Sequence, residues 1–269
     1  MRICPILLLL LLVSGLHSQE APPPSSAQIP YVEREQRNFN FYPGGKLSIS
    51  SAVPGSLKII GWKTGSVRVD AETIVYSLPP EEAKSLLKKH PIRVRWNQTS
   101  ASVLVQEAPA RMEVNLTVYV PGDKTDLIAK IPRGDISIES VNGWIETSTG
   151  EGCLEARSLG GYFSGITPRG DIVVELSGLR WKGLELAAMT QHGSVDLRLP
   201  ERFSAALQLE TRNGSISVDY PEQIVDGEPQ PPDILINGNA QSLKATVGDG
   251  GAPIRLLTYS GNVSLVKID

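Results

Sequence analysis

Residues 167–174 read TPRGDIVV, and four further stretches of the chain follow the same pattern. Each copy has a short turn that ends in glycine, then a small polar residue, then apolar residues at alternate positions. Alternation of this kind is typical of a β-strand, in which successive side chains point to opposite faces. The other copies are IPRGDISI at 131–138, TQHGSVDL at 190–197, TRNGSISV at 211–218 and TYSGNVSL at 258–265.

The apolar residues change parity at the glycine. Before Gly214, Leu207 and Leu209 have odd numbers, whereas Ile216 and Val218 after it have even numbers. Because side chains alternate faces along a strand, a corner or bulge is needed if both apolar sets are to face one interior. Glycine suits a corner because it accepts positive φ. Each copy therefore predicts a strand, a corner and a second strand.

The glycines of the five copies are 36, 23, 21 and 47 residues apart. The two long gaps predict doubled units, with degenerate copies near Gly152 and between Gly238 and Gly250. Units of about 20 residues that stack on one another predict an all-β fold, with a β-solenoid over residues 126–269. An antiparallel sandwich is the alternative, because the Asn-Gly pairs at 142–143, 213–214 and 237–238 are good hairpin turns.

Residues 38–125 are expected to form an N-terminal β-rich part with one small helix at residues 80–90. Prolines and glutamates open this helix, and lysines precede the proline that stops it. Alternating stretches at 92–96 and 103–105 follow, and the polar residues 97–102 between them predict a hairpin. Residues 19–37 are expected to be a linker rich in proline and serine.

Residues 1–18 have the pattern of a secretory signal peptide. Arg2 precedes a short apolar run at 6–13, and small residues follow it. The run is shorter than the roughly 20 apolar residues that span a bilayer, although an uncleaved anchor is an alternative. We therefore expect the mature chain in the periplasm or outside the cell. Cys153 is then the one remaining cysteine, which excludes an intrachain disulfide, and it is expected to be a buried small residue.

The composition excludes one class of partner. The chain has 269 residues, 41% of them hydrophobic, which is enough for a buried core. Its net charge is −3, and no basic run stands out. Because nucleic-acid-binding proteins normally carry a basic face, we expect no nucleic-acid partner.

No catalytic, cofactor-binding or metal site is predicted. His90 lies at a helix end and His192 in a turn, so neither is placed as the base of a catalytic triad. Asp135 and Asp171 follow glycine at equivalent positions, but calcium needs six to eight oxygen ligands, and sister copies carry serine or asparagine there. Glycines also recur every nine residues from 134 to 170. We treat this spacing as coincidence, because the core of calcium-binding nonapeptide repeats is absent.

Two groups of residues raise the possibility of carbohydrate chemistry. Cleavage of a polysaccharide would need two paired carboxylates, and the candidates are Glu139, Glu146, Glu155 and Glu175. Exposed positions without catalytic pairing are the favoured interpretation. Trp144, Trp181 and Tyr162 could form a face on which sugars stack, but a role in the core or at the end of the stack is favoured.

The order of several motifs resembles the bacterial putative-adhesin family over residues 38–269. These motifs are an Ile-x-Gly-Trp-like element at 59–62, the small helix, a strand that ends in Val-Pro at 120–121, and the train of Thr-x-x-Gly units. Pro132 and Pro168 depart from the family's usual serine-like residue, and residues 222–232 interrupt the train. The resemblance implies an extracytoplasmic β-solenoid with an inferred role in adhesion, and it supplies no catalytic residues.

The sequence therefore favours an exported, non-enzymatic envelope protein that acts as a binding or scaffolding module. Its expected partner is a cell-surface glycan or an envelope protein. Two other classes stay open: a carbohydrate-active β-helix enzyme, and an envelope-stress accessory that contacts a membrane signalling partner.

Overall fold

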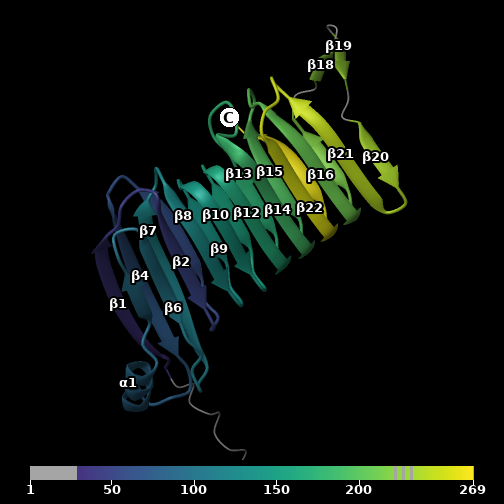
Figure 1. The fold of residues 1–269 in the computed structure, drawn as a ribbon. Coiled ribbons are helices and arrows are strands. Elements are labelled where there is room, and N and C mark those ends of the chain that lie inside the picture. Colours follow the sequence, from purple (N-terminus) through teal and green to yellow (C-terminus); the bar gives the residue numbers. More distant parts are fainter. Residues whose placement is uncertain (1–28, 221–222, 226–227, 231–232, 269) are drawn as a thin grey trace, which may run out of the picture.

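The chain folds into two large β-sheets that face each other, with one short helix at one end (Figure 1). The computed structural model describes residues 29–220, 223–225, 228–230 and 233–268. The expected signal peptide and residues 19–28 of the expected linker lie outside these ranges. The prediction of an all-β fold with one small helix is confirmed. The two sheets are not closed onto each other, and each ends in edge strands.

Sheet A has ten strands and sheet B has eleven. In spatial order, sheet A consists of β1 (Tyr31–Asn40), β4 (Ser66–Val75), β7 (Met112–Pro121), β3 (Leu57–Trp62), β9 (Ile136–Glu139), β11 (Leu154–Arg157), β13 (Ile172–Glu175), β15 (Val195–Pro200), β23 (Val263–Ile268) and β17 (Ile216–Asp219). Sheet B consists of β20 (Ile234–Asn237), β21 (Ala240–Val247), β16 (Ala205–Asn213), β22 (Pro253–Ser260), β14 (Gly183–His192), β12 (Gly160–Arg169), β10 (Asn142–Thr149), β8 (Thr125–Ile131), β2 (Gly45–Ser51), β6 (Ser100–Val105) and β5 (Arg93–Trp96). A separate pair joins β18 (Gln223–Val225) and β19 (Glu228–Gln230).

From β8 to β17 the chain passes back and forth between the sheets. An even-numbered strand in sheet B is followed by a glycine corner and then by an odd-numbered strand in sheet A. Neighbouring strands of this series are parallel and in register, as Leu154 of β11 is with Ile136 of β9 and Ile172 of β13. Leu207, Leu209 and Ile216 are all buried, so the apolar residues on both sides of Gly214 do face one interior.

The order of strands in space departs from their order in the chain. The pair β22 and β23 lies between the pair β14 and β15 and the pair β16 and β17. Likewise, β2 and β3 lie between β6 and β7 on one side and β8 and β9 on the other. The expected boundary between residues 125 and 126 does not interrupt the sheets, because β8 and β9 pair with β2 and β3.

The two expected degenerate copies have different outcomes. Gly152 lies at the corner between β10 and β11, as predicted. The expectation between Gly238 and Gly250 is wrong, because β20 and β21 form an antiparallel hairpin there. Gly238 has a positive φ in that hairpin, whereas the Asn-Gly pairs at 142–143 and 213–214 lie at corners between the sheets.

The N-terminal end holds the helix α1 (Pro80–Lys89), where the sequence placed it. Ala83 and Leu87 bury the apolar face of α1, and prolines, first-turn glutamates and last-turn lysines delimit it. The predicted hairpin is also present, because β5 pairs with β6 in antiparallel fashion. Strand β1 begins inside the stretch expected to be a linker. Phe39 is the only buried residue of β1. The sequence of β1 accordingly has no alternation of apolar residues that would predict a strand.

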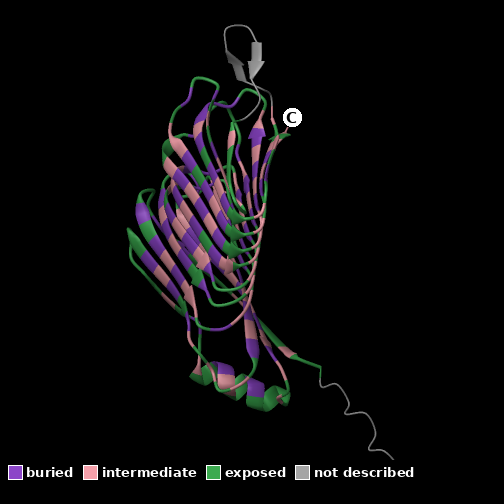
Figure 2. Ribbon diagram, turned by 90° about the vertical axis from the view of Figure 1, so that its right-hand side faces the viewer, coloured by how far each residue is buried: buried purple, intermediate pink, exposed green. Residues whose placement is uncertain are grey.

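The core fills the space between the sheets (Figure 2). Buried and partly buried residues alternate along β4 and β7. Several buried positions hold threonine rather than an apolar residue, including Thr149, Thr167 and Thr190.

No helix within the described residues is long and apolar enough to cross a membrane.

Candidate functional site

The glycines that recur in the sequence pattern lie in a column along one edge of the stack. At Gly152, where φ is 144°, an added Cβ would lie 2.1 Å from the carbonyl oxygen of Gly134. A Cβ added at Gly170 would likewise lie 2.1 Å from the carbonyl oxygen of Gly152. Both distances are far below van der Waals contact, so any larger residue would push neighbouring strands apart. The glycines of the pattern are therefore explained by packing between strands.

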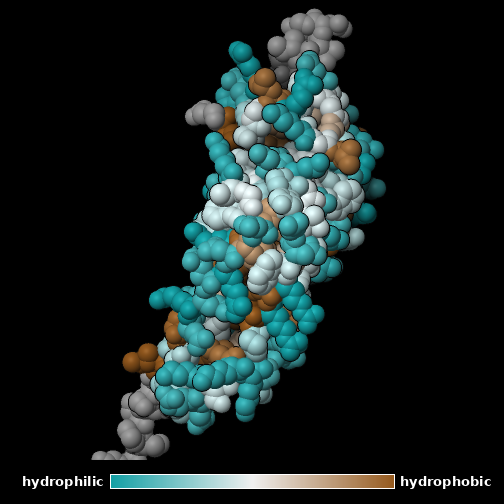
Figure 3. All heavy atoms as spheres, turned by 60° about the vertical axis from the view of Figure 1, so that its left-hand side comes forward, coloured by the Kyte–Doolittle hydropathy of each residue, from teal (hydrophilic) through white to brown (hydrophobic). Residues whose placement is uncertain are grey.

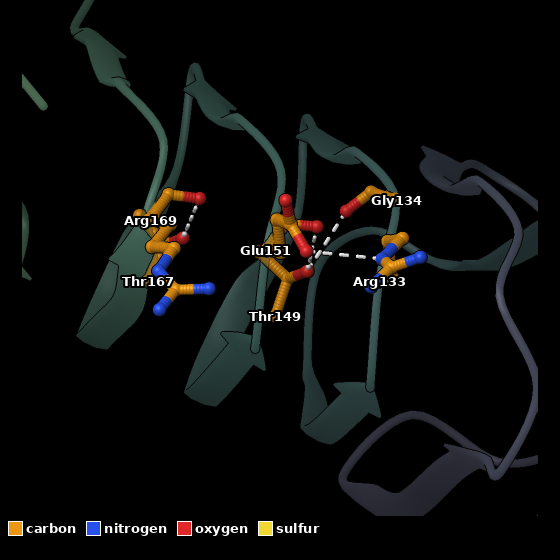
Figure 4. A network of polar contacts seen from close by, with 6 residues as sticks. All are labelled: Arg133, Gly134, Thr149, Glu151, Thr167 and Arg169. Carbon is orange, nitrogen blue, oxygen red and sulfur yellow. Dashed lines mark hydrogen bonds and ion pairs between the residues drawn. The ribbon is translucent and has the colours of Figure 1, made fainter. Parts of the chain in front are cut away.

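The threonines of the pattern form a ladder beside this column, and Figure 4 shows two of them, Thr149 and Thr167. The Thr149 hydroxyl donates to the carbonyl oxygen of Gly134 at 2.8 Å, and the Thr167 hydroxyl donates to that of Gly152 at 2.9 Å. The same bond recurs further along the stack, from Thr190 to Gly170, from Thr258 to Gly193 and from Thr211 to Gly261. Because a buried carbonyl without a partner costs stability, the threonine serves the fold rather than a ligand.

The spacing of nine residues between glycines is not a coincidence. Gly143 and Gly161 lie at the opposite edge of the stack, where an added Cβ at Gly161 would lie 2.2 Å from the carbonyl oxygen of Gly143. Gly134 and Gly152 are 18 residues apart at the first edge. The interval of nine is therefore the distance along the chain between two corners of one 18-residue unit.

The aspartates considered for calcium bond to backbone instead. Asp135 Oδ1 accepts the backbone N–H of Cys153 at 2.8 Å, and Asp171 Oδ1 accepts that of Ser194 at 2.7 Å. Asn262 Oδ1 accepts the N–H of Ser215 in the same way. This shared role explains why aspartate and asparagine both occupy the position. Among the described residues, no group of three or more His, Cys, Asp or Glu side chains is placed to hold a metal ion.

The histidines and the cysteine lie apart from one another. His90 is the residue after α1, and its backbone N–H donates to the carbonyl oxygen of Leu86. His192 is exposed at the end of β14, next to Arg169 on β12 and Ser260 on β22. The expectation that Cys153 is buried is wrong. It follows the corner glycine Gly152, so its side chain points away from the interior that Leu154 faces.

The four glutamates considered for catalysis are split between the sheets. Glu146 is on β10 of sheet B, whereas Glu139, Glu155 and Glu175 are on sheet A. Glu155 forms an ion pair with Arg157, and Glu175 lies 3.7 Å from Arg198. The outer face of sheet A thus carries charged side chains of both signs. A shallow groove of about 460 Å³ over β1, β4 and β7 has the same character, because Arg34 and Gln36 on its wall bond to Glu72 and Asp70.

The three aromatic residues considered for sugar stacking differ in position. Trp181 is buried, as the favoured interpretation predicted. For Trp144 and Tyr162 that interpretation is wrong, because Trp144 is 46% exposed and Tyr162 is partly exposed on the outer face of sheet B. They are direct cross-strand neighbours on β10 and β12, and their rings stack with centroids 4.0 Å apart and planes at 22°. The sequence held a signal for this, since Trp144 precedes the buried Ile145 and must face the opposite way.

Polar groups hold the aromatic pair in place. Trp144 Nε1 donates to Glu146 Oε1 at 2.7 Å, and the backbone N–H of Trp144 donates to Asp126 Oδ1 at 3.0 Å. On the other side, Glu185 of β14 is the cross-strand neighbour of Tyr162 and forms an ion pair with Arg255 of β22. We call the exposed surface of Asp126, Trp144, Glu146, Tyr162 and Glu185 the aromatic platform.

The aromatic platform combines stacked rings with carboxylates at the surface. Figure 3 shows one side of the molecule as mostly hydrophilic, with separate small apolar patches. An exposed pair of stacked rings has apolar faces and carries polar groups at its edge. With carboxylates on both flanks, such a surface can hold a ligand that offers C–H groups to the rings and hydroxyl donors to the oxygens.

The chain resembles solved structures at low sequence identity. No family model and no curated protein matches it. Among solved structures, a putative cell adhesion protein from Clostridium sporogenes matches 88% of this chain and 100% of its own, with 13% identity and a TM-score of 0.44. A putative adhesin from Bacteroides fragilis matches 88% and 97%, with 11% identity and a TM-score of 0.27. At these identities and TM-scores, the likenesses say nothing about what this chain binds.

Proposed function

We propose that this chain is an exported, non-enzymatic binding protein of the adhesin type, and that its aromatic platform binds carbohydrate. The observation that carries the proposal is the stacking of Trp144, which is exposed, on Tyr162, which is partly exposed. The faces of stacked aromatic rings are apolar, and the flat C–H face of a sugar ring can pack against such a face.

The geometry favours a chain of sugars over an enclosed small molecule. Pockets for small ligands bury most of the ligand surface, but the aromatic platform lies on the open outer face of a sheet. Because Tyr162 covers one face of the Trp144 ring, the other face looks along the sheet toward Asp126 on β8. A glycan that runs across β8, β10 and β12 would stack on the rings and donate hydroxyl hydrogen bonds to Asp126, Glu146 or Glu185.

The absence of catalysis is part of the proposal. Hydrolysis of a glycosidic bond needs two carboxyl groups at a defined separation, one of them able to give a proton. Glu146 accepts the Trp144 indole N–H, and Glu185 is paired with Arg255. Both carboxylates are thus already engaged in contacts with neighbouring side chains.

The finer statements on architecture and location are also proposals. We propose a β-solenoid, supported by parallel pairing from β8 through β15, with one register shift between Gly161 and Tyr162 of β12. We further propose membership of the bacterial putative-adhesin family, and export to the periplasm or cell exterior, on the strength of the sequence motifs and of residues 1–18.

The test is a glycan array probed with the wild-type protein and single variants. We expect Trp144→Ala and Tyr162→Ala to lower the affinity for a bound glycan by about tenfold or more, as for other central aromatic contacts. Trp96→Ala is the matched control, because Trp96 is 51% exposed on sheet B but stacks on Phe39, away from the platform. Equal binding by all variants would contradict the proposal. Glycan cleavage that Glu146→Gln abolishes would replace it with an enzymatic function.

A further inference from the structure

The free edges of the two sheets differ in charge. The edge strand β1 carries Glu33, Arg34, Glu35 and Arg37, and β5 carries Arg93 and Arg95. Charged side chains on an edge strand hinder its pairing with another chain. The edge strand β20 reads Ile-Leu-Ile-Asn and has no charge, although Leu235 is 65% exposed and Ile236 is 69% exposed. Within the described residues, this edge strand therefore lacks the charged side chains that β1 and β5 carry.

The hairpin between β20 and β21 determines which backbone groups face outward. Gly238 and Asn239 form a two-residue loop that Asn237 and Ala240 close, and Gly238 has a φ of 60°. In a two-residue hairpin the closing pair is hydrogen-bonded, and bonded pairs alternate with non-bonded ones. Asn237 and Leu235 therefore bond to β21. The N–H and C=O groups of Ile234 and Ile236 point away from β21, along the free edge.

A second copy of β20 matches this edge in one antiparallel register. Residues with outward backbone groups must oppose each other, which sets Ile234 against Ile236 of the second copy and Leu235 against its own equivalent. This register forms two bonded pairs with four hydrogen bonds, and the side chains that face each other within residues 234–236 are all apolar. It also sets Asn237 opposite Asp233, an amide against a carboxylate. For β5, by contrast, the equivalent register sets Val94 against Trp96 of the second copy, and it brings Arg95 opposite its own equivalent.

We propose that two copies of this chain associate through β20, with Leu235 on the two-fold axis. A two-fold axis of this kind runs perpendicular to the sheet, so sheet B continues across the contact with both outer faces on the same side. The pair would then present two aromatic platforms to one surface. The contact is small, so association is weak and concentration-dependent. Weak binding sites gain avidity when they are paired in this way.

Cysteine cross-linking tests the register. In a background with Cys4→Ser and Cys153→Ser, Leu235→Cys places two thiols in a non-bonded pair, where the Cα atoms approach to about 4.5 Å. We expect oxidation to yield at least tenfold more covalent dimer from Leu235→Cys than from Leu184→Cys, a control at an exposed leucine (71%) of the same sheet. Ile236→Cys, which faces Ile234, should also yield little. Equal yields from Leu235→Cys and Leu184→Cys would overturn the proposal.

Sedimentation equilibrium tests the association itself on the protein with its native cysteines. The wild type should gain mass toward a dimer as its concentration rises, and Leu184→Lys should behave in the same way. Ile236→Lys and Ile236→Pro should stay monomeric, because the first brings charge to the edge and the second removes an outward N–H donor without touching the bonds to β21. A monomeric wild type up to millimolar concentration, or dimers that both Ile236 variants retain, would also overturn it. Neither result depends on glycan binding.

Discussion

The hydroxyl of Thr167 on β12 donates a hydrogen bond to the carbonyl oxygen of Gly152, 2.9 Å away at the corner of the neighbouring unit. Thr167 is fully buried, and its side chain also lies 3.2 Å from the carbonyl oxygen of Arg169. One side chain thus ties its own turn to the turn beside it. The bond explains why threonine stands three residues before glycine in four of the five copies.

Thr167→Val should destabilise the protein by about 1–2 kcal/mol, because it keeps the shape of the side chain but leaves the Gly152 carbonyl without this donor. The matched control is Thr147→Val on β10. Thr147 is buried as well, but its hydroxyl has no hydrogen-bond partner among the described residues. Its replacement should be neutral or stabilising. Chemical denaturation measures both changes, and equal losses at the two positions would show that the ladder contributes nothing.

Gly152→Ala should destabilise the protein by roughly 3 kcal/mol or more, since it combines backbone strain with a collision against the next corner. A comparison with Gly178→Ala separates the two effects. Gly178 also has a positive φ, of 81°, but no atom lies within 4 Å of its added Cβ. That variant should lose only about 1 kcal/mol, the cost of the left-handed backbone. Thermal unfolding of both proteins checks the difference.

Removal of residues 252–269, which include β22 and β23, should also destabilise the strands that pair with them. Because β22 and β23 separate β14 and β15 from β16 and β17, their loss leaves β16 and β17 with no parallel neighbour. Hydrogen exchange should then accelerate throughout β16, β17 and β21, while β8 to β11 keep their protection. Continued protection of β16 would mean that its hairpin partner β21 suffices to hold it.

The protein should lose stability at high pH because the phenol of Tyr220 ionises. Burial is the main cause that raises the pKa of this phenol, whose hydroxyl donates to the Pro200 carbonyl and accepts the Phe203 N–H. A raised folded-state pKa means that the contribution is complete below the unfolded value of about 10 and is lost as pH rises toward the folded value. Denaturation between pH 9 and 11 should show a steeper loss for the wild type than for Tyr220→Phe. Tyr42→Phe, at an exposed tyrosine, should leave the slope unchanged.

Much of the fold follows from local signals in the sequence. The parity change at Gly214 predicted a corner with one shared interior, and the prolines and charges around residues 80–90 predicted α1. The position of β22 and β23 could not be predicted in this way. Each unit offers the same pattern of apolar residues and the same glycine corner, so the sequence does not specify which unit lies beside which. Strand β1 could not be predicted for another reason: an edge strand with one buried residue has no alternation of apolar residues.

The candidate site was within reach of the same reasoning. Ile145 is buried, so parity alone turns Trp144 outward, and the 18-residue interval sets Tyr162 beside it. Two successive nine-residue glycine intervals make up that 18-residue unit, so the glycine spacing carried this information even without a calcium motif. What the sequence could not supply is the stacking of the two rings and the bond from Trp144 to Glu146, which depend on side-chain rotamers.

The most direct test of the proposed function follows the tryptophan indole N–H signals by NMR during a titration with a glycan that the array identifies. The chain has four tryptophans, so single Trp→Phe variants assign the four signals. We predict that the Trp144 signal shifts with saturation, because its N–H bonds to Glu146 within the aromatic platform, and that the Trp96 and Trp181 signals stay in place. A Trp144 signal that does not move while the glycan binds would contradict the account.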